Sequence, residues 1–155
     1  MSSIIEERLA ALGLILPEAP APVANYVPWL VAGELLFISG QISKAPDGSL
    51  LTGRLGDGLG IEDGQKAARY CALNILAQAK AALGSLERVV QVMRLNGFVA
   101  STPETGDHPK VINGASDLMV AVLGDAGRHT RGAVGVASLP SNVAVEIDAV
   151  IRIKP

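Results

Sequence analysis

Apolar residues recur at helical spacing in two stretches of the chain. In residues 62–83 they fall on one stripe, acidic residues open the segment, and Gly84 closes it. The second stretch begins at His108, has proline at its first helical position, where proline is favoured, and stops at Gly124. The stripes consist of Ala68, Cys71, Ala72, Ile75, Ala79, Ala82 and Leu83 in the first stretch, and of Val111, Ala115, Leu118, Met119 and Val122 in the second. The pattern predicts two long amphipathic helices.

The last segment has a different period, because its apolar residues occupy every second position. One face carries Val143, Val145, Ile147, Ala149, Ile151 and Ile153, and the other carries Ala144, Glu146, Asp148, Val150 and Arg152. This alternation predicts a strand over residues 143–153. Residues 131–138 are predicted to form another strand, which pairs back on the last one through a turn at residues 139–142.

Further strands are predicted nearer the N-terminus. Two apolar runs in residues 26–43 surround Ala32-Gly33-Glu34 and indicate a hairpin, although Pro28 makes the first run an edge strand or an irregular one. Residues 45–60 contain five glycines and are expected to be a loop with one short strand. A longer strand is predicted over residues 88–100.

The chain begins with a predicted short helix over residues 2–12. Ser2 or Ser3 can cap its first turn, and Gly13 ends it. Three prolines in residues 17–25 then indicate an extended connector, which is too short to separate two domains.

This order of elements predicts one α+β domain, with two long helices packed on one face of a mixed sheet. The domain is expected to span residues 25–155, after an N-terminal helix and connector in residues 1–24. Two helices can cover only one face, yet the strands carry apolar residues on both. Apolar residues make up 49% of the chain and charged residues only 18%, so the uncovered face is expected to lie between the subunits of a homo-oligomer.

The composition excludes several classes of function. The net charge is −2 and the 13 Lys and Arg residues are scattered, so nucleic acid is not an expected partner. The single cysteine excludes a disulfide within the chain, and no Cys/His spacing indicates a metal site. Without a dinucleotide fingerprint or a phosphate-binding loop, no cofactor is expected. The acidic start is unlike a secretory signal and no apolar run spans a bilayer, so a cytoplasmic protein without a membrane partner is expected.

Arg131 is the first candidate for chemistry. It stands at the start of a predicted strand and is followed by the small residues Gly132, Ala133 and Gly135, which leave room beside it. It is either a solvated strand end or the anchor for a planar anion, because a guanidinium group pairs bidentately with a carboxylate.

Glu146 is the second candidate, since it interrupts an otherwise apolar strand. In the predicted hairpin it lies opposite Gly135, about 13 Å along the strand from Arg131. It either belongs to a self-neutralising row with Asp148 and Arg152, or it acts as a general base or a water-positioning carboxylate. One chain does not easily bring Glu146 and Arg131 together, whereas a site shared between subunits would.

Five other residues are weaker candidates. Tyr26 is either a ligand-binding phenol or an anchor at a strand start, and Asn113 is otherwise a polar position on the solvent side of a helix. His108 is most simply a helix cap, and His129 is either a proton shuttle or an inert loop histidine. Cys71 lies on an apolar stripe and is interpreted as a core residue.

Several segments of the sequence resemble motifs of the YjgF/RidA family. The segment "TRGAVGVASLPSNVAVEIDAV" resembles its C-terminal signature, in which an arginine, a short apolar strand and Leu-Pro precede Val-Glu-Ile on the last strand. The segment "ANYVPWLVAGELLFISGQIS" resembles its tyrosine segment and its Ser-Gly-Gln-Ile hairpin, and "CALNILAQAKAALGSLERVVQV" and "VINGAS" resemble its middle. The resemblance runs from about Asn25 to Ile153.

The resemblance implies a chorismate-mutase-like α+β fold, assembled as a homotrimer with ligand clefts between the subunits. It also implies hydrolysis of reactive enamines and imines, such as 2-aminoacrylate, to 2-keto acids and ammonia. The family carries an older description as an endoribonuclease that acts on single-stranded RNA and inhibits translation.

The resemblance also implies roles for individual residues. Arg131 is expected to hold the substrate carboxylate, and Tyr26 to be the tyrosine of the cleft. Gly40 is expected to face the ligand with its backbone, and Asn113 to lie near the cleft. Glu146 is expected to orient the attacking water.

The sequence departs from the deaminase subgroup at two positions. Ala133 and Gly135 stand where that subgroup usually has Cys and Glu, and the N-terminal helix and the "GRHTR" run are typical of a distinct subgroup. His129 is a candidate replacement polar group at the substrate site. The sequence therefore leaves two alternatives to a deaminase: a trimer that binds small carboxylates or 2-keto acids without turnover, and an RNA-cleaving protein in which His108 and His129 act as an acid–base pair.

Overall fold

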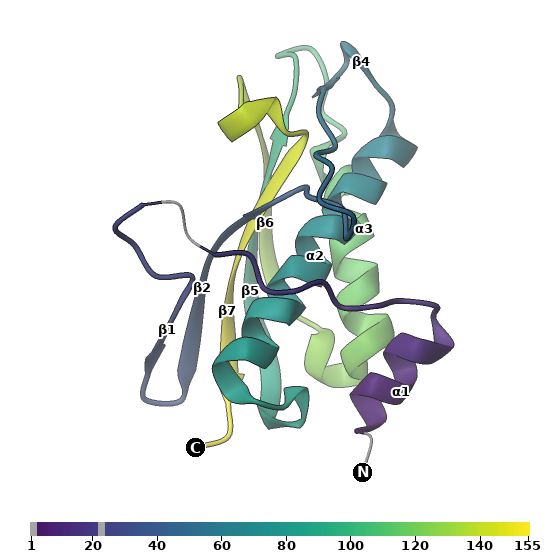
Figure 1. Ribbon diagram of the computed structural model, residues 1–155. Coiled ribbons are helices and arrows are strands. Elements are labelled where there is room, and N and C mark those ends of the chain that lie inside the picture. Colours follow the sequence, from purple (N-terminus) through teal and green to yellow (C-terminus); the bar gives the residue numbers. More distant parts are fainter. Residues whose placement is uncertain (1–2, 22–23) are drawn as a thin grey trace.

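The computed structural model describes residues 3–21 and 24–155 of the chain. Its helices are α1 (Ile4–Ala11), α2 (Ile61–Leu83) and α3 (His108–Leu123). Its strands are β1 (Trp29–Ala32), β2 (Leu35–Ile42), β3 (Arg54–Leu55), β4 (Gly58–Leu59), β5 (Val89–Ala100), β6 (Thr130–Val136) and β7 (Val145–Ile153). Figure 1 shows α2 and α3 on one side of the main sheet, with α1 beside their lower end.

Both long helices form where the apolar stripes predict them. Every residue of the two predicted stripes is buried except Ala82, which is half-buried. Gly84 ends α2 in the left-handed conformation that glycine adopts without strain. The N-terminal helix is capped by Ser3, whose Oγ accepts a hydrogen bond from the backbone N–H of Glu6 at 3.0 Å. The other predicted cap, Ser2, lies outside the described residues.

The main sheet is mixed and has the strand order β1-β2-β7-β5-β6. Strands β5 and β6 run parallel, and the other neighbouring pairs run antiparallel. The predicted pairing of residues 131–138 with residues 143–153 is wrong, because β5 lies between β6 and β7. A short connection normally joins neighbouring strands, but the one at Pro140–Asn142 carries the chain past the end of β5. Strand β7 then forms ladders with β2 and β5 on its two edges, which leaves no edge for β6.

This strand order also changes the neighbours of Glu146. The residue does not lie opposite Gly135, as the predicted hairpin required. It lies opposite Ile42 of β2 on one side and Phe98 of β5 on the other. Gly135 lies on β6, two strands away from β7. It pairs with Val99 of β5. Glu146 is therefore an interior position of the sheet, bounded by two ladders.

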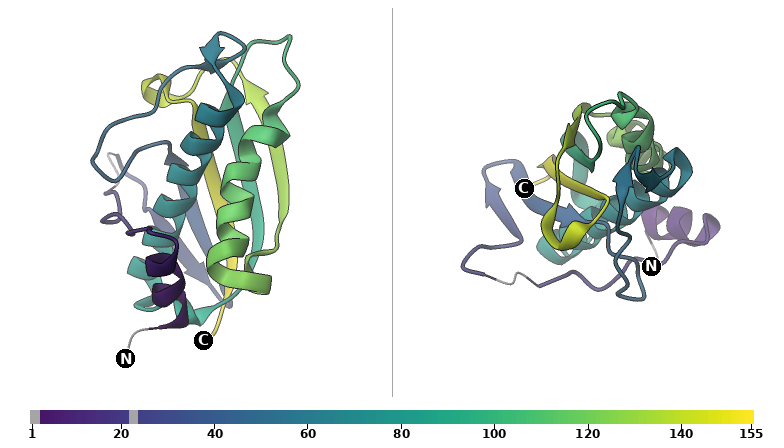
Figure 2. Two further views of the ribbon diagram at one scale, coloured as in Figure 1. Left: turned by 90° about the vertical axis from the view of Figure 1, so that its right-hand side faces the viewer. Right: turned by 90° about the horizontal axis from the view of Figure 1, so that it is seen from above.

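The helices cover one face of this sheet and leave the other open. Figure 2 shows α2 and α3 side by side in front of the strands in its left view. On β7 the row from Val145 to Ile153 is buried beneath them, whereas the alternate row is half-buried or exposed. The open face carries Leu30, Phe37, Phe98, Val134 and Val150, and 59% of Leu30 and 50% of Val134 are exposed. A single chain thus leaves an apolar surface in water.

No helix in the described part of the chain is long and apolar enough to cross a membrane.

The predicted loop over residues 45–60 contains the two-residue strands β3 and β4, and Thr52 forms an isolated bridge with Val143 of the last segment. The loop is thereby held against the same end of the sheet as the connection between β6 and β7.

Helices α2 and α3 approach closely at Gly114. A β-carbon at this position would overlap with the backbone carbonyl of Gln65 on α2, so the two helix backbones meet there without an intervening side chain. We expect Gly114→Ala to lower the free energy of unfolding by about 2 kcal/mol, because a backbone has to move, although alanine is the better helix former. Urea denaturation measures this difference.

Gly106→Ala is the matched control for this prediction. A β-carbon at Gly106 has no neighbour within 4 Å, and its backbone does not occupy the left-handed region. That variant should unfold within about 0.5 kcal/mol of the wild type. Equal stability of the two variants would show that the helices are not in contact at Gly114.

Candidate functional site

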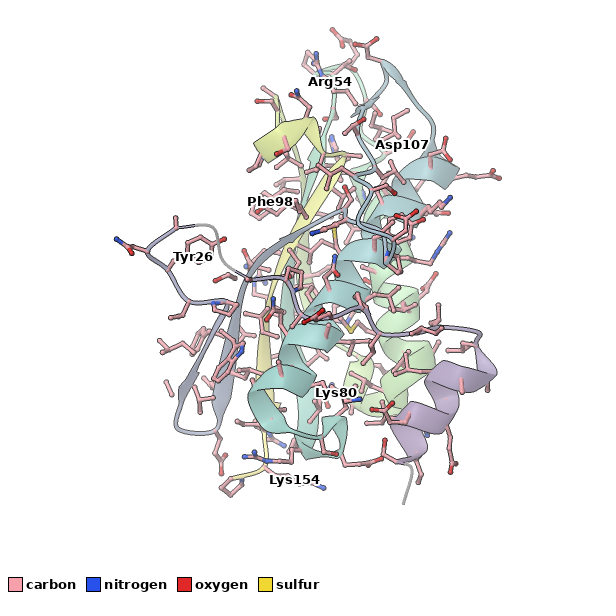
Figure 3. The ribbon with its side chains drawn as sticks, viewed as in Figure 1. Tyr26, Arg54, Lys80, Phe98, Asp107 and Lys154 are labelled. Carbon is pink, nitrogen blue, oxygen red and sulfur yellow. The ribbon has the colours of Figure 1, made fainter. Side chains whose placement is uncertain are left out.

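Tyr26, Gly40 and Glu146 line one hollow of about 380 Å³. Its walls are formed by Pro20, Ala21, Tyr26, Pro28, Gly40, Gln41, Ile42, Lys44, Asn74, Gln78, Pro140, Ser141 and Glu146. We call this the Glu146 hollow. Three residues that the sequence proposed separately therefore share one cavity. In Figure 3, Tyr26 lies on the loop before β1, on the side of the sheet away from α3.

The backbone around Gly40 brings it against Glu146. The register of β2 against β7 shifts between Ile38 and Gln41, so Gly40 lies in a bulge rather than in the regular ladder. A β-carbon at Gly40 would lie 2.5 Å from Oε1 of Glu146. Only glycine therefore leaves the carboxylate in its present position.

Glu146 is half-buried, and its surroundings favour the protonated carboxyl group. Burial raises the pKa of Glu146 above its ordinary value, and repulsion from Asp148 raises the pKa further. Within the described ranges Glu146 forms no ion pair, although Lys44 lines the same hollow. A carboxylate with a raised pKa in a cavity is a stronger base than an ordinary carboxylate and is suited to accepting a proton from water.

Two buried amides of α2 complete the wall of this hollow, and sequence reasoning missed both. Asn74 donates hydrogen bonds from Nδ2 to the carbonyls of Ile42 and Lys44, at 3.3 and 3.1 Å. Gln78 donates from Nε2 to the carbonyl of Pro20 at 2.7 Å. Each is at least 98% buried. The available signal was their position within the apolar helix, where a buried amide needs hydrogen-bond partners.

Arg131 belongs to a second group, on β6 and α3. Its Nη1 donates to Oγ of Ser116 at 3.1 Å, and its Nη2 donates to the carbonyl of Pro109 at 3.3 Å. The side chain is half-buried and takes part in no ion pair within the part of the chain that the structure describes. Its positive charge is therefore held in place but is not neutralised.

His129 holds the same serine from the other side. Its Nδ1 lies 2.6 Å from the carbonyl of Gly127, and its Nε2 lies 2.8 Å from Oγ of Ser116. A carbonyl only accepts, so Nδ1 carries a proton and donates it to Gly127, while Nε2 shares a hydrogen bond with the hydroxyl group of Ser116. His129 thus acts on Arg131 through Ser116, a residue that sequence reasoning did not identify.

Asn113 is exposed, and it lies on the same face of α3 as Pro109 and Ser116, which accept the hydrogen bonds of Arg131. It follows Pro109 by four residues and precedes Ser116 by three, and such positions are neighbours on a helix surface. The structure therefore joins Arg131 and His129 through Ser116, and it places Asn113 on the same face of α3.

The two groups lie apart within one chain. Glu146 is on β7 and Arg131 is on β6, and β5 separates these strands. Gly40 is on β2, three strands from β6 or about 14 Å at the usual strand spacing. In addition, Arg131 points toward the helix-covered side, because it contacts Ser116 of α3. A single chain does not bring the arginine to the carboxylate.

The remaining candidates have structural surroundings of their own. His108 is the first residue of α3, whereas the cap position is held by Asp107. His108 begins α3, whereas the imidazole of His129 contacts Ser116, eight residues or about 12 Å further along the helix, so the two histidines do not form an acid–base pair within one chain. Cys71 is fully buried in the core, and burial raises the pKa of its thiol well above the ordinary value.

Gly135 has a reason of its own to lack a side chain. A β-carbon there would overlap with Nε2 of His108 and Oγ of Ser101, so a glutamate is not accommodated at this position. Ala133 packs against the core. Among the described residues, His, Cys, Asp and Glu side chains nowhere gather in threes that could hold a metal ion.

Comparison with known proteins identifies relatives over most of the chain. Protein TCP17 of Trypanosoma cruzi is 48% identical over 158 residues, which cover 99% of both chains. The crystal structure of Atu1372 from Agrobacterium tumefaciens, described as having unknown function, is 50% identical with a TM-score of 0.90 and covers 97% of this chain and 94% of its own. RidA from an Antarctic Psychrobacter is 30% identical with a TM-score of 0.61, covering 88% and 94%.

A family model confirms this relationship and the fold that goes with it. The model described as "YjgF/chorismate_mutase-like, putative endoribonuclease" matches residues 6–149, which is most of the chain. The strand order, the two long helices on one sheet face and the shared motifs are thereby explained together. The chain belongs to the YjgF/RidA family and has its chorismate-mutase-like α+β fold.

Proposed function

We propose that the protein hydrolyses enamine and imine intermediates derived from amino acids, releasing 2-keto acids and ammonia. The observation that carries this proposal is the Glu146 hollow, in which a half-buried carboxylate with a raised pKa lies against a glycine and beside a tyrosine. Membership of the YjgF/RidA family, whose motifs imply this chemistry by resemblance, supports the proposal.

The second part of the proposal is a site completed by two copies of the chain. Arg131 is a positioned cation without a carboxylate partner in the described part of the chain, and it lies apart from the Glu146 hollow. The open sheet face is apolar and suited to burial against other copies. In a homotrimer, Arg131 and Asn113 of one copy would hold a substrate carboxylate at the Glu146 hollow of its neighbour.

The reaction then needs no group beyond these side chains and water. Arg131 pairs with the carboxylate of an imino acid and orients its C=N carbon. An enamine such as 2-aminoacrylate enters as the protonated imine, after its methylene carbon takes a proton from solvent. Glu146 accepts a proton from water as the water oxygen attacks the C=N carbon of this cation, which forms a neutral carbinolamine. Return of that proton to nitrogen, loss of the hydroxyl proton to solvent and cleavage of the C–N bond give the 2-keto acid and ammonia. The phenol of Tyr26 donates a hydrogen bond to the substrate in the same hollow.

The test is the rate at which pyruvate forms from 2-aminoacrylate. This enamine is released from serine by a dehydratase, and lactate dehydrogenase with NADH follows the pyruvate. We expect the purified protein to increase the rate over the buffer reaction, in proportion to its concentration. A rate that does not respond to the protein, across a panel of imino acids, would contradict the deaminase proposal.

A second candidate is a trimer that binds small carboxylates or 2-keto acids without turnover. Gly135 favours it, because the Ser101–His108 pair fills the space where a deaminase would carry glutamate. Calorimetric binding of pyruvate with no release of product from 2-aminoacrylate would select this function over hydrolysis.

A further inference from the structure

A second hollow with basic and hydroxyl groups lies where β3, β5, α3 and β6 meet. It has a volume of about 420 Å³ and is lined by Arg54, Ser101, Thr102, Pro103, Thr105, His108, Gly135, Val136 and Ala137. We call it the Arg54 hollow. It shares no lining residue with the Glu146 hollow, and Arg131 does not line it. Figure 3 shows Arg54 at the end of the molecule that also carries Asp107, the cap residue of α3.

A serine–histidine pair forms one wall of this hollow. Oγ of Ser101 and Nε2 of His108 lie 3.0 Å apart, and Ser101 is 93% buried. Gly135 of β6 lies against this pair, and a β-carbon at Gly135 would overlap with Nε2 of His108 and Oγ of Ser101. The absence of a side chain at Gly135 thus keeps the pair in place and leaves it facing the cavity.

Arg54 brings a positive charge that has little to bind within the chain. Nη2 donates to the carbonyl of Ser101 at 3.5 Å, the long limit of a hydrogen bond. None of the described residues forms an ion pair with Arg54. A guanidinium has five N–H donors, so most of them are available to a ligand.

The acidic groups near the hollow do not compensate this charge. No lining residue is acidic. Asp107 stands at the cap of α3, but its carboxylate pairs with Lys110 at 3.3 Å and makes no hydrogen bond to the helix N–H groups. The N-terminus of the 16-residue helix therefore adds its positive dipole end to the charge of Arg54. Glu104 is exposed, and Asp57 lies on the turn after β3; neither carboxylate forms an ion pair with Arg54.

We propose that the Arg54 hollow is a second ligand site, which binds a small oxyanion such as a carboxylate or a phosphate group. Arg54 supplies the paired donors that fit a planar or tetrahedral oxyanion, and the hydroxyls of Ser101, Thr102 and Thr105 supply further donors. His108 lies within the same wall and reports on occupancy. The site does not depend on the proposed hydrolase activity, because it uses none of the same residues.

The experiment follows the imidazole signals of the full-length protein by NMR. The chain has two histidines, so a His108→Asn variant assigns both. Titration with inorganic phosphate, and separately with acetate, should move the His108 signals to saturation, independently of any change in the His129 signals caused by an anion at Arg131. Arg54→Gln should weaken the apparent affinity at least about tenfold. Arg69→Gln, which removes the same charge from an exposed position on α2, should not.

The two anions distinguish the sources of the ligand. Tighter phosphate binding would assign the site to a phosphorylated molecule, and tighter acetate binding would assign it to a carboxylic acid. The proposal is overturned if neither anion moves the His108 signals more than sodium chloride at equal ionic strength. It is also overturned if Arg54→Gln responds like the wild type. Arg131→Gln should leave this titration unchanged, so failure of the proposed hydrolase would not be mistaken for failure of this site.

Discussion

Replacing Glu146 with glutamine should lower the rate of pyruvate release from 2-aminoacrylate by about 10²- to 10⁴-fold. Glutamine keeps the shape of the side chain and its fit against Gly40, but it does not accept a proton from water. Pyruvate binding, measured by calorimetry, should change little, because the arginine that is proposed to hold the carboxylate is unaltered. The coupled lactate dehydrogenase assay measures the rate.

The pH profile gives the control for this prediction. The pKa of Glu146 is raised, first by burial and then by Asp148, and the ionised form is the one that accepts a proton. The wild-type rate should therefore fall as the pH falls through this raised pKa, at a higher pH than for an ordinary carboxyl group. Asp148→Asn removes the repulsion, so it should move this fall to lower pH and leave the rate at high pH largely intact. A Glu146→Gln variant with the wild-type rate would exclude this carboxylate from the reaction.

The Arg131→Gln variant should bind pyruvate about 100-fold more weakly than the wild type, as expected when one partner of a desolvated charge pair is lost. Its guanidinium is held by Ser116 and Pro109 and carries no counter-charge of its own in the described structure, so the carboxylate would lose both its charge partner and its paired donors. Isothermal calorimetry measures this affinity.

Arg128→Gln is the matched control for Arg131. Arg128 lies three residues away, and its Nε contacts the carboxylate of Asp125 at 3.3 Å in an exposed position. Its loss should leave the pyruvate affinity within about twofold of the wild type. Analytical ultracentrifugation of each variant checks that the oligomeric state is unaltered. Equal affinities of the Arg131 variant and the wild type would remove the arginine from both proposed functions.

The helices could be predicted because the information is local. The stripes in α2 and α3 repeat at the helical period, and Gly84 and Gly124 stop the two segments, so few other arrangements bury these side chains. The alternation in β7 was equally clear, and its predicted face is the buried one. The pairing of the strands could not be predicted in this way, because it depends on contacts between distant segments of the chain. The turn at Pro140–Asn142 suggested a hairpin, and only the ladders of β7 with β2 and β5 show that β6 lies elsewhere.

The candidate site divides in the same way. The residue types of Glu146 and Arg131 suggested chemistry, and the family motifs suggested Tyr26, Gly40 and Asn113. The contacts of these residues came from the fold. The bulge in β2 sets Gly40 against the carboxylate, and the packing of α3 on β6 sets Ser116 against Arg131. No pattern in the sequence marks Ser116, because a half-buried serine on an amphipathic helix is ordinary.

The sequence by itself determined the elements, the apolar face that each element buries, and the family, because periodicity and motifs are properties of short segments. The tertiary structure alone decided that β5 separates the arginine strand from the carboxylate strand, and that the two functional groups do not meet within one chain. Strand order depends on backbone hydrogen bonds between segments that are far apart along the chain. Side-chain periodicity does not determine which strand edges pair with one another.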